Sequence, residues 1–244
     1  MELRLDLHIH SYHSPDGRMT PREIAIRARE RGLNGVAICD HNRVFPAEEL
    51  RRVSAEFPDF LFIPGVEMST ECGHLLGWFV TEEIRARTFP EIADEIRRQG
   101  GIAVLAHPFE HTKSPERLEQ ASPYIDGIEI WNSRAERKNR RANAQAAAFA
   151  AERGLRGFAG SDAHTLPEIG NGVTIINAAA LTPEAVKAAL LSDGVRTDGR
   201  RSKAVYTAAS QWTRRRKSHA SPISYCKWAL FAVKCFLSDA FRRD

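Results

Sequence analysis

The sequence predicts an α/β protein whose parallel strands close into a barrel with helices on the outside, and three observations carry this prediction. Short apolar segments alternate with helical segments along most of the chain, as they do in βαβ units. About seven strands at this spacing suit a closed barrel better than an open sheet. Side chains able to bind metal ions fall at the C-terminal ends of these strands, where barrel enzymes place their chemistry.

The first half of the chain alternates strand and helix patterns. Residues 4–10 (RLDLHIH) carry apolar side chains at every second position, which predicts a strand. From Thr20 to Glu23 the sequence has a capping box with proline at the first helical position, which predicts a helix that ends at Gly32. The other elements expected here are strands at 35–41, 60–68 and 74–80 and a helix at 46–56.

The second half continues the alternation and then changes character. Strands are expected at 102–108, 127–132, 157–164 and 173–177, and helices at 90–101, from Ser114, at 135–153 and from Thr182. Residues 198–222 are rich in Arg, Ser, Gly and Ala, so we predict a linker there. Residues 223–241 follow as a basic amphipathic helix, in which Lys227 and Lys234 share one polar stripe.

Charge is distributed unevenly along the chain. Residues 200–244 contain eleven Lys or Arg and two Asp, a net charge of +9, so the total of +4 leaves −5 for residues 1–199. An acidic segment over residues 1–199 followed by a basic tail over residues 200–244 indicates two regions with different functions. We therefore predict a barrel domain over residues 1–199, and a basic linker with an amphipathic helix over residues 200–244.

The sequence also carries an expectation about location. The first ten residues include charges and histidines where a signal peptide needs an apolar run. The four cysteines are scattered without C-x-x-C spacing, which is typical of reduced thiols. We expect a cytoplasmic protein, with the basic tail allowing peripheral association with a membrane.

Six of the nine histidines lie at the ends of predicted strands. Side chains alternate along a strand, so His8 and His10 point the same way. Asp162 and His164 share a face for the same reason. One histidine at a strand end is more often a hydrogen-bonded structural residue than a ligand, but the joint pattern with nearby Asp and Glu favours a metal centre. Imidazole and carboxylate ligands without thiolates suit Zn²⁺, Mn²⁺ or Fe²⁺, and this many ligands suit two or three ions.

At these residues the sequence resembles the PHP family, the polymerase and histidinol phosphatase superfamily of phosphoesterases. The matching motifs, in chain order, are His8-Ile9-His10-Ser11, Ser14-Pro15-Asp16-Gly17, Cys39-Asp40-His41-Asn42, Pro64-Gly65-Val66-Glu67, His74-Leu75-Leu76-Gly77, Ala106-His107-Pro108, Gly127-Ile128-Glu129-Ile130-Trp131-Asn132 and Gly160-Ser161-Asp162-Ala163-His164. Each motif is weak alone, but the ordered set, over about residues 3–197, is specific. The resemblance implies a distorted (β/α)7 barrel of the short stand-alone kind.

The resemblance also implies a three-metal site. Its nine ligands would be His8, His10, Asp16, His41, Glu67, His74, His107, Asp162 and His164. By analogy the three metals would be held by His8, His10 and Asp162 with Glu67, by Glu67 with His74 and His107, and by Asp16, His41 and His164. A complete set argues against a non-catalytic copy of the family.

The expected reaction is hydrolysis of a phosphoester of a nucleotide, another small phosphomonoester or an oligonucleotide by hydroxide that the metals activate. The residues assigned catalytic roles are the carboxylates Glu67 and Asp162, the proton donor His111 (or His13), and the phosphate-binding Arg43 and Arg134. Glu129 is expected to orient a ligand histidine.

Two other functions stay open at this point. An amidohydrolase-type barrel also begins with His-x-His, but it would need a lysine at a strand end, and Lys113, Lys138 and Lys187 do not end predicted strands. The second is a regulatory, non-catalytic PHP module tethered through the tail. Residues 214–241 themselves suit packing on the barrel or a partner protein, an anionic membrane surface, or nucleic acid.

Overall fold

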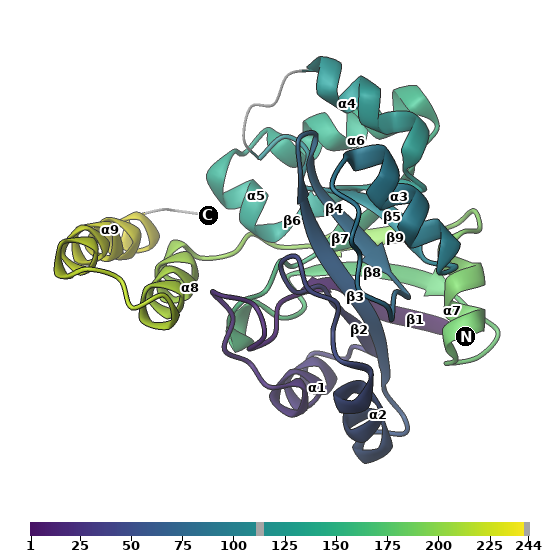
Figure 1. Ribbon diagram of the computed structural model, residues 1–244, viewed down its shortest axis with the longest axis horizontal. Coiled ribbons are helices and arrows are strands. Elements are labelled where there is room, and N and C mark those ends of the chain that lie inside the picture. The colour runs from purple at the N-terminus through teal and green to yellow at the C-terminus, as the bar shows by residue number, and fades with distance from the viewer. Residues whose placement is uncertain (111–114, 242–244) are drawn as a thin grey trace.

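The computed structural model describes residues 1–110 and 115–241 (Figure 1). The strands are β1 (Glu2–Ile9), β2 (Gly35–Ile38), β3 (Leu61–Thr70), β4 (Gly73–Trp78), β5 (Ile102–Ala106), β6 (Gly127–Asn132), β7 (Arg156–Gly160), β8 (Gly172–Asn177) and β9 (Arg196–Gly199). The α-helices are α1 (Pro21–Glu30), α2 (Ala47–Glu56), α3 (Phe89–Arg98), α4 (Pro115–Ala121), α5 (Ser133–Lys138), α6 (Ala142–Arg153), α7 (Pro183–Leu190), α8 (Ala204–Lys217) and α9 (Pro222–Ala240).

Within the described residues the strands form one sheet in the order β7-β6-β5-β4-β3-β2-β1-β8-β9. The sheet curves so that β7, at one end of this order, lies next to β8, near the other end. There the backbone N–H of Ala159 donates to Thr174 Oγ1 at 2.8 Å, and this hydroxyl donates to the Ala159 carbonyl at 2.9 Å. Ile9 and Ala163 form a parallel bridge nearby. The predicted α/β barrel is therefore confirmed as a nearly closed, mixed sheet with helices outside (Figure 1).

The barrel interior is a packed apolar core. Trp78 and Phe158 are fully buried, and their rings meet edge to face with centroids 5.0 Å apart. Alternate residues of β1, including Leu3 and Leu5, fill the space around them. Helices α1, α2, α3 and α6 cover the outer face through further buried clusters. Burial of this apolar surface holds the strand ends, and the side chains beyond them, in fixed positions.

The expectation that all strands run parallel was wrong. β4 runs antiparallel to both β3 and β5, and β8 runs antiparallel to both β1 and β9. The connection from β3 to β4 contains only Glu71 and Cys72. Two residues suffice for a hairpin but not for a parallel crossover, which needs a dozen or more. His74 therefore reaches the site from the start of an antiparallel strand rather than from the end of a parallel one.

Two expectations about helices also need correction. The single helix expected at 135–153 is two helices, α5 and α6, separated at Asn139, which has extended backbone angles. The linker expected at 198–222 contains the end of β9 and all of α8. Ala and Arg, which dominate this segment, are good helix formers, so its composition suits a helix once a partner packs on it.

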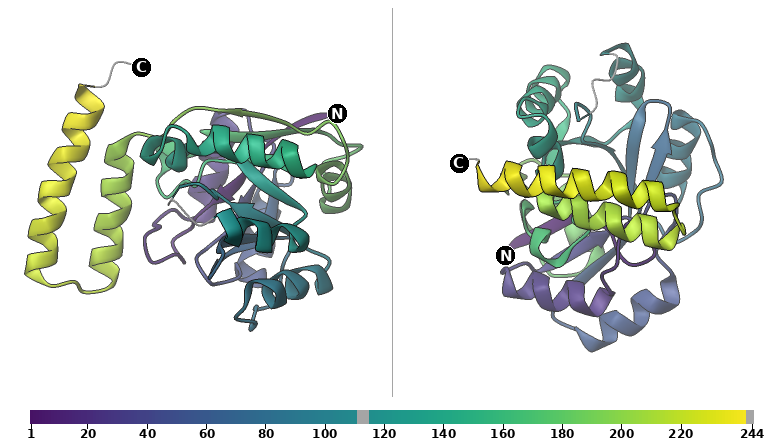
Figure 2. Two further views of the ribbon diagram at one scale, coloured as in Figure 1. Left: turned by 90° about the horizontal axis from the view of Figure 1, so that it is seen from above. Right: turned by 90° about the vertical axis from the view of Figure 1, so that its left-hand side faces the viewer.

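α8 and α9 form a helical hairpin beside the barrel, with α9 in the outer layer (Figure 2). The Asp239 carboxylate accepts hydrogen bonds from the N–H groups of Ala204 and Val205, both at 2.9 Å, so α9 caps the start of α8. Trp228 Nε1 donates to the carbonyl of Ala208 at 2.8 Å. The expected tail helix is confirmed as α9. In the described part of the chain, no helix combines the length and the apolar character needed to cross a membrane.

Candidate metal centre

Two irregular strand registers direct central side chains of the site into the barrel. The pairing of β1 with β2 shifts between Asp6 and Ile9. Such a bulge breaks the alternation of side chains, so Leu7 and His8 both face the interior. A similar shift in β6 follows Glu129, which lies buried with Oε1 2.9 Å from His8 Nδ1.

Glu67 lies at the centre of the site, with its side chain 1% exposed. Its Oε1 is 2.7 Å from His74 Nδ1 and 3.0 Å from His107 Nε2. Its Oε2 is 2.7 Å from His41 Nδ1 and 3.5 Å from His10 Nε2. One carboxylate thus faces imidazoles on both of its oxygen sides, as a ligand bridging two metal ions must.

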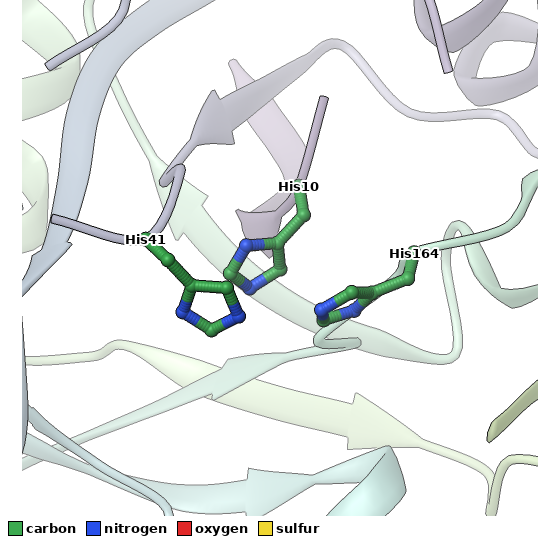
Figure 3. Close-up of side chains that lie close together, drawn as sticks. All are labelled: His10, His41 and His164. Carbon is green, nitrogen blue, oxygen red and sulfur yellow. The ribbon is translucent and has the colours of Figure 1, made fainter. Parts of the chain in front are cut away.

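The rings of His10, His41 and His164 converge on one another (Figure 3). Their nitrogen atoms come within 4.8 Å of one another, close enough to share an ion. Asp16 Oδ1 lies 3.5 Å from His41 Nε2 and 3.3 Å from His164 Nε2. Asp162 Oδ1 lies 3.3 Å from His10 Nε2. The structure therefore brings all nine predicted ligands into one cup.

The hydrogen bonds of His8, His107 and His164 leave their Nε2 atoms for the cup. Carboxylate and carbonyl oxygens only accept, so Nδ1 must carry the proton where it meets one. The Nδ1 of His8 meets Glu129, that of His107 meets Glu110, and that of His164 meets the carbonyl of Asp162, each at 2.9 Å. Metal-binding histidines are oriented in this way.

Ser14 fixes His10 in the same manner. The Ser14 hydroxyl donates to the buried Asp40 carboxylate at 2.7 Å, so it must accept from His10 Nδ1 at 3.1 Å. Asp40 also accepts from the backbone N–H and the hydroxyl of Ser11 at 2.8 and 2.6 Å. Asp40 therefore organises the loop that carries Asp16, although it is not itself among the predicted ligands.

Two buried carboxylate oxygens of the cup accept no hydrogen bond: Oε2 of Glu67 and Oδ1 of Asp16. His41 Nδ1 is near the first, but its geometry is not that of a hydrogen bond. Buried acceptors without a donor are costly in a native protein. A divalent cation would satisfy both oxygens, so the donor set fits the metals that the sequence implies.

Charges within the cup shift the pKa of its members. Burial lowers the pKa of His10 well below its usual range, and the neighbouring His164 and His41 lower it further. His10 is therefore neutral, the form that binds metal. Burial alone would raise the pKa of Glu67, but His41 and His8 hold it well below its usual range. The Glu67 carboxylate is thus ionised.

Backbone strain gathers at the same strand ends. Three non-glycine residues have left-handed φ angles there: Asn42 at 53°, His107 at 28° and Asp162 at 55°. Such conformations are uncommon outside glycine and persist only where the surroundings impose them. His107 and Asp162 are themselves predicted ligands, so the strain accompanies the placement of metal-binding groups.

Arg134 does not have the surroundings expected of a phosphate-binding group. Its side chain is buried, and its Nε and Nη2 donate to the two oxygens of Glu168 at 2.8 and 2.7 Å. Glu168 also accepts from the backbone N–H groups of His164 and Thr165 at 3.2 and 3.1 Å. This ion pair supports the loop that carries His164. Arg134 therefore has a structural role that does not require it to bind a substrate.

Two of the remaining predicted residues, Arg43 and His13, are described by the structure and lie outside the cup. Arg43 is exposed two residues after His41 and keeps its candidacy for phosphate binding. His13 Nε2 is 2.7 Å from Glu49 Oε2, away from the cup. His111 lies outside the described residues.

Sequence reasoning missed Glu110 and undervalued Lys138. The side chain of Glu110 is 4% exposed, between His107 and Lys138, with which it forms ion pairs. Burial lowers the pKa of Lys138, while the carboxylates of Asp162 and Glu67 act in the opposite direction. A third of the Lys138 side chain is exposed, and its ammonium group pairs with Glu110, which in turn contacts His107 of the cup. Its place in a charged helical run made it look like part of a solvated face.

Lys217 at the end of α8 reaches the loop that holds Asp16. Its Nζ donates to the carbonyls of Tyr12, Ser14 and Gly17 at 2.6, 2.7 and 2.7 Å. An ammonium group has three protons to donate, and here each has an acceptor. The tail hairpin thus supports one of the loops that supply metal ligands.

Comparison with known families identifies the family to which the chain belongs. The family model for the PHP domain matches residues 6–108, and the model described as PHP-associated matches residues 140–194. The two matches together span more than half of the chain. The chain belongs to the PHP family. Seven of the nine gathered side chains lie in the first matched segment and two in the second.

The chain is also similar to individual relatives and solved structures. An uncharacterised protein of Methanocaldococcus jannaschii is 31% identical over 142 residues, which cover 54% of this chain and 82% of the relative. A two-domain Bacteroides vulgatus protein containing a predicted PHP-like metal-dependent phosphoesterase aligns with a TM-score of 0.66 at 17% identity, over 87% of this chain and 70% of that one. A lesion-specific endonuclease from Pyrococcus furiosus aligns with a TM-score of 0.56 at 20% identity, over 81% of this chain and 58% of that one.

Proposed function

We propose that this PHP protein is a metal-dependent phosphoesterase acting on a nucleotide, another small phosphomonoester or an oligonucleotide. One observation carries the proposal: four histidines have Nδ1 committed to an oxygen acceptor, while their Nε2 atoms face the cup. Four histidines oriented in this way can bind metal ions through Nε2, and these nitrogen atoms have no other evident role in the fold. The endonuclease activity named for the Pyrococcus furiosus neighbour supports including nucleic acid among the substrates.

The nine gathered side chains would hold two or three divalent ions, Mn²⁺, Zn²⁺ or Fe²⁺. Bound ions would supply Lewis acidity toward phosphoryl oxygens and an acidified water. Glu67 would bridge the groups on its two sides, and Asp162 would join His8 and His10. Glu129 keeps His8 in one tautomer and also accepts from the backbone N–H of His107 at 2.9 Å, so it positions two ligands at once.

Lys138 is the cation that the geometry favours for binding the substrate phosphate. It borders the cup, whereas Arg134 is buried against Glu168 and Arg43 lies at the exposed rim. Glu110 holds the ammonium group in place while leaving part of it exposed. A lysine so placed would orient a phosphoryl oxygen through a charge-assisted hydrogen bond.

Lys138→Met should raise KM for a phosphorylated substrate by about 10- to 100-fold, since a hydrogen bond to a charged group contributes about 1.5–3 kcal/mol. Methionine keeps the apolar stem but removes the charge. Steady-state kinetics of the metal-loaded protein would measure the change, and Lys138→Arg should restore most of the binding. A variant with unchanged KM but reduced metal content would instead make Lys138 a support for Glu110 and His107.

The activity itself is tested with the metal-free protein reloaded separately with Mn²⁺, Zn²⁺ or Fe²⁺. We expect hydrolysis of an aryl phosphate monoester or diester with at least one of these ions and none without metal. Short RNA and DNA oligomers and a set of phosphomonoesters would then define the substrate class. Metal uptake without any hydrolysis across these substrates would favour the regulatory alternative.

A further inference from the structure

The outer helix α9 exposes large apolar side chains along its whole length. Residues with 46–75% exposure on this helix are Ile223, Leu230, Val233, Phe236 and Leu237. Across the rest of the described chain, the exposed large apolar residues are Met1, Tyr12, Ile26 and Phe241, and Phe241 directly follows α9. A patch concentrated on one element marks an interaction surface, whereas scattered single residues do not.

The packing on α8 does not use this face. Tyr225 and Trp228 pack against Trp212 of α8, with ring centroids 5.1 and 4.5 Å from it. Cys235 is buried in the same interface, against Ala204 and Ala208. At about 100° per residue, the exposed residues cover an arc of about 140° on the other side of the helix. α9 therefore has two apolar faces, of which the hairpin covers one, and the other points away from the barrel (Figure 2).

Among the described residues, the charges beside the open face of α9 all have one sign. The charged residues of α9 are Lys227, Lys234 and Asp239, and Asp239 is committed to the start of α8. Lys227 and Lys234 are exposed and lie together at one edge of the apolar arc. Arg214 and Arg216 add exposed positive charge at the end of α8, next to the turn into α9.

We propose that this face of α9 docks on an anionic lipid surface, with its apolar side chains in the interface and its lysines at the headgroups. Helices that bind at a membrane interface typically carry apolar side chains next to basic side chains that have no acidic partner. Each basic residue near such a surface adds attraction of electrostatic origin. The +9 charge of residues 200–244 against −5 for the body orients the hairpin toward the lipid.

A second copy of the chain fits this face less well. The spacing of Ile223, Leu230 and Leu237 is that of a coiled-coil seam. However, Phe236 lies outside such a seam and widens the apolar surface beyond what a paired helix covers. A symmetric pair would also bring together faces whose exposed charges are lysines on both sides, with no acid to complement them. Self-association is therefore kept as an outcome of the experiment.

The experiment uses the full chain and vesicles of phosphatidylcholine alone or of about three parts phosphatidylcholine to one part phosphatidylglycerol. We expect co-sedimentation with the anionic vesicles, weakened by salt. The double variant Leu230→Gln with Leu237→Gln should lower the partition coefficient at least about tenfold, because both residues lose apolar burial. Lys227→Glu with Lys234→Glu should abolish the preference for anionic vesicles.

Ile26→Gln is the matched control, because Ile26 is an exposed apolar residue on α1, away from the hairpin. It should leave vesicle binding unchanged. Thermal unfolding checks that each variant is folded. Absence of binding to either vesicle would overturn the proposal, as would equal binding to both. So would a stable dimer, seen by analytical ultracentrifugation, that the double glutamine variant dissociates.

Discussion

Glu67→Gln is expected to lower metal-dependent turnover by at least about 1,000-fold. The substitution removes a carboxylate that would bind metal ions, and such ions stabilise the charge of the transition state by several kcal/mol. Glutamine has nearly the same shape, so packing in the cup is kept. What is lost is a charge that faces four imidazoles at 2.7–3.5 Å. Bound metal, measured by mass spectrometry after gel filtration, should fall together with kcat/KM for an aryl phosphate.

Glu48→Gln provides the control for this experiment, because Glu48 is a half-exposed carboxylate on α2, paired only with neighbouring arginines of its own helix. It should match the unaltered protein in metal content and turnover. Full metal content and full activity in Glu67→Gln would show that the centre of the cup has been misassigned.

Arg134→Met is expected to lower the free energy of unfolding by about 3–5 kcal/mol, the usual cost of leaving one partner of a buried ion pair without the other. The side chains of Arg134 and Glu168 are 6% and 0% exposed. Burial alone would raise the pKa of Glu168, but Arg134 holds it below its ordinary value of 4.5. The pair therefore stabilises the fold above about pH 4.5, and its contribution is lost as pH falls through the folded pKa.

Urea unfolding at several pH values measures this effect. The difference between the unaltered protein and Arg134→Met should be largest near neutrality and should shrink in acid. Arg140→Met, at an exposed position after α5, should change stability little. Normal stability with a raised KM for substrate would restore Arg134 to the phosphate-binding role expected from the sequence.

Most ligands of the cup were within reach of the sequence because simple rules place them at strand ends, whereas Asp16, in a loop, was expected only from the family resemblance. Alternation puts His8 and His10 on one face, and strand ends gather at one end of a barrel. The hairpin of β3 and β4 was also within reach, since two residues cannot carry a crossover. It was misread because the regular strand–helix alternation elsewhere in the chain predicted that all strands run parallel.

Other features depend on contacts that a sequence does not display. The bulge after Asp6 has no residue signature, because it exists only relative to the register of β2. Whether Arg134 or Lys138 meets a phosphate depends on which carboxylate lies next to each in the fold. α8 was taken for a linker because its helix is stabilised by α9, which composition alone does not reveal.

The three bonds of Lys217 have a consequence for shortening the chain. The family matches end at residue 194, so residue 199 looks like a natural place to stop. A chain cut there would leave the carbonyls of Tyr12, Ser14 and Gly17 without the ammonium group that they share. The excised barrel would keep every metal-binding side chain but lose a brace on the loop of Asp16. A fragment that preserves this loop must therefore include Lys217, and with it α9, because α9 packs on α8 and caps its start. This hairpin lies beyond both matched family segments.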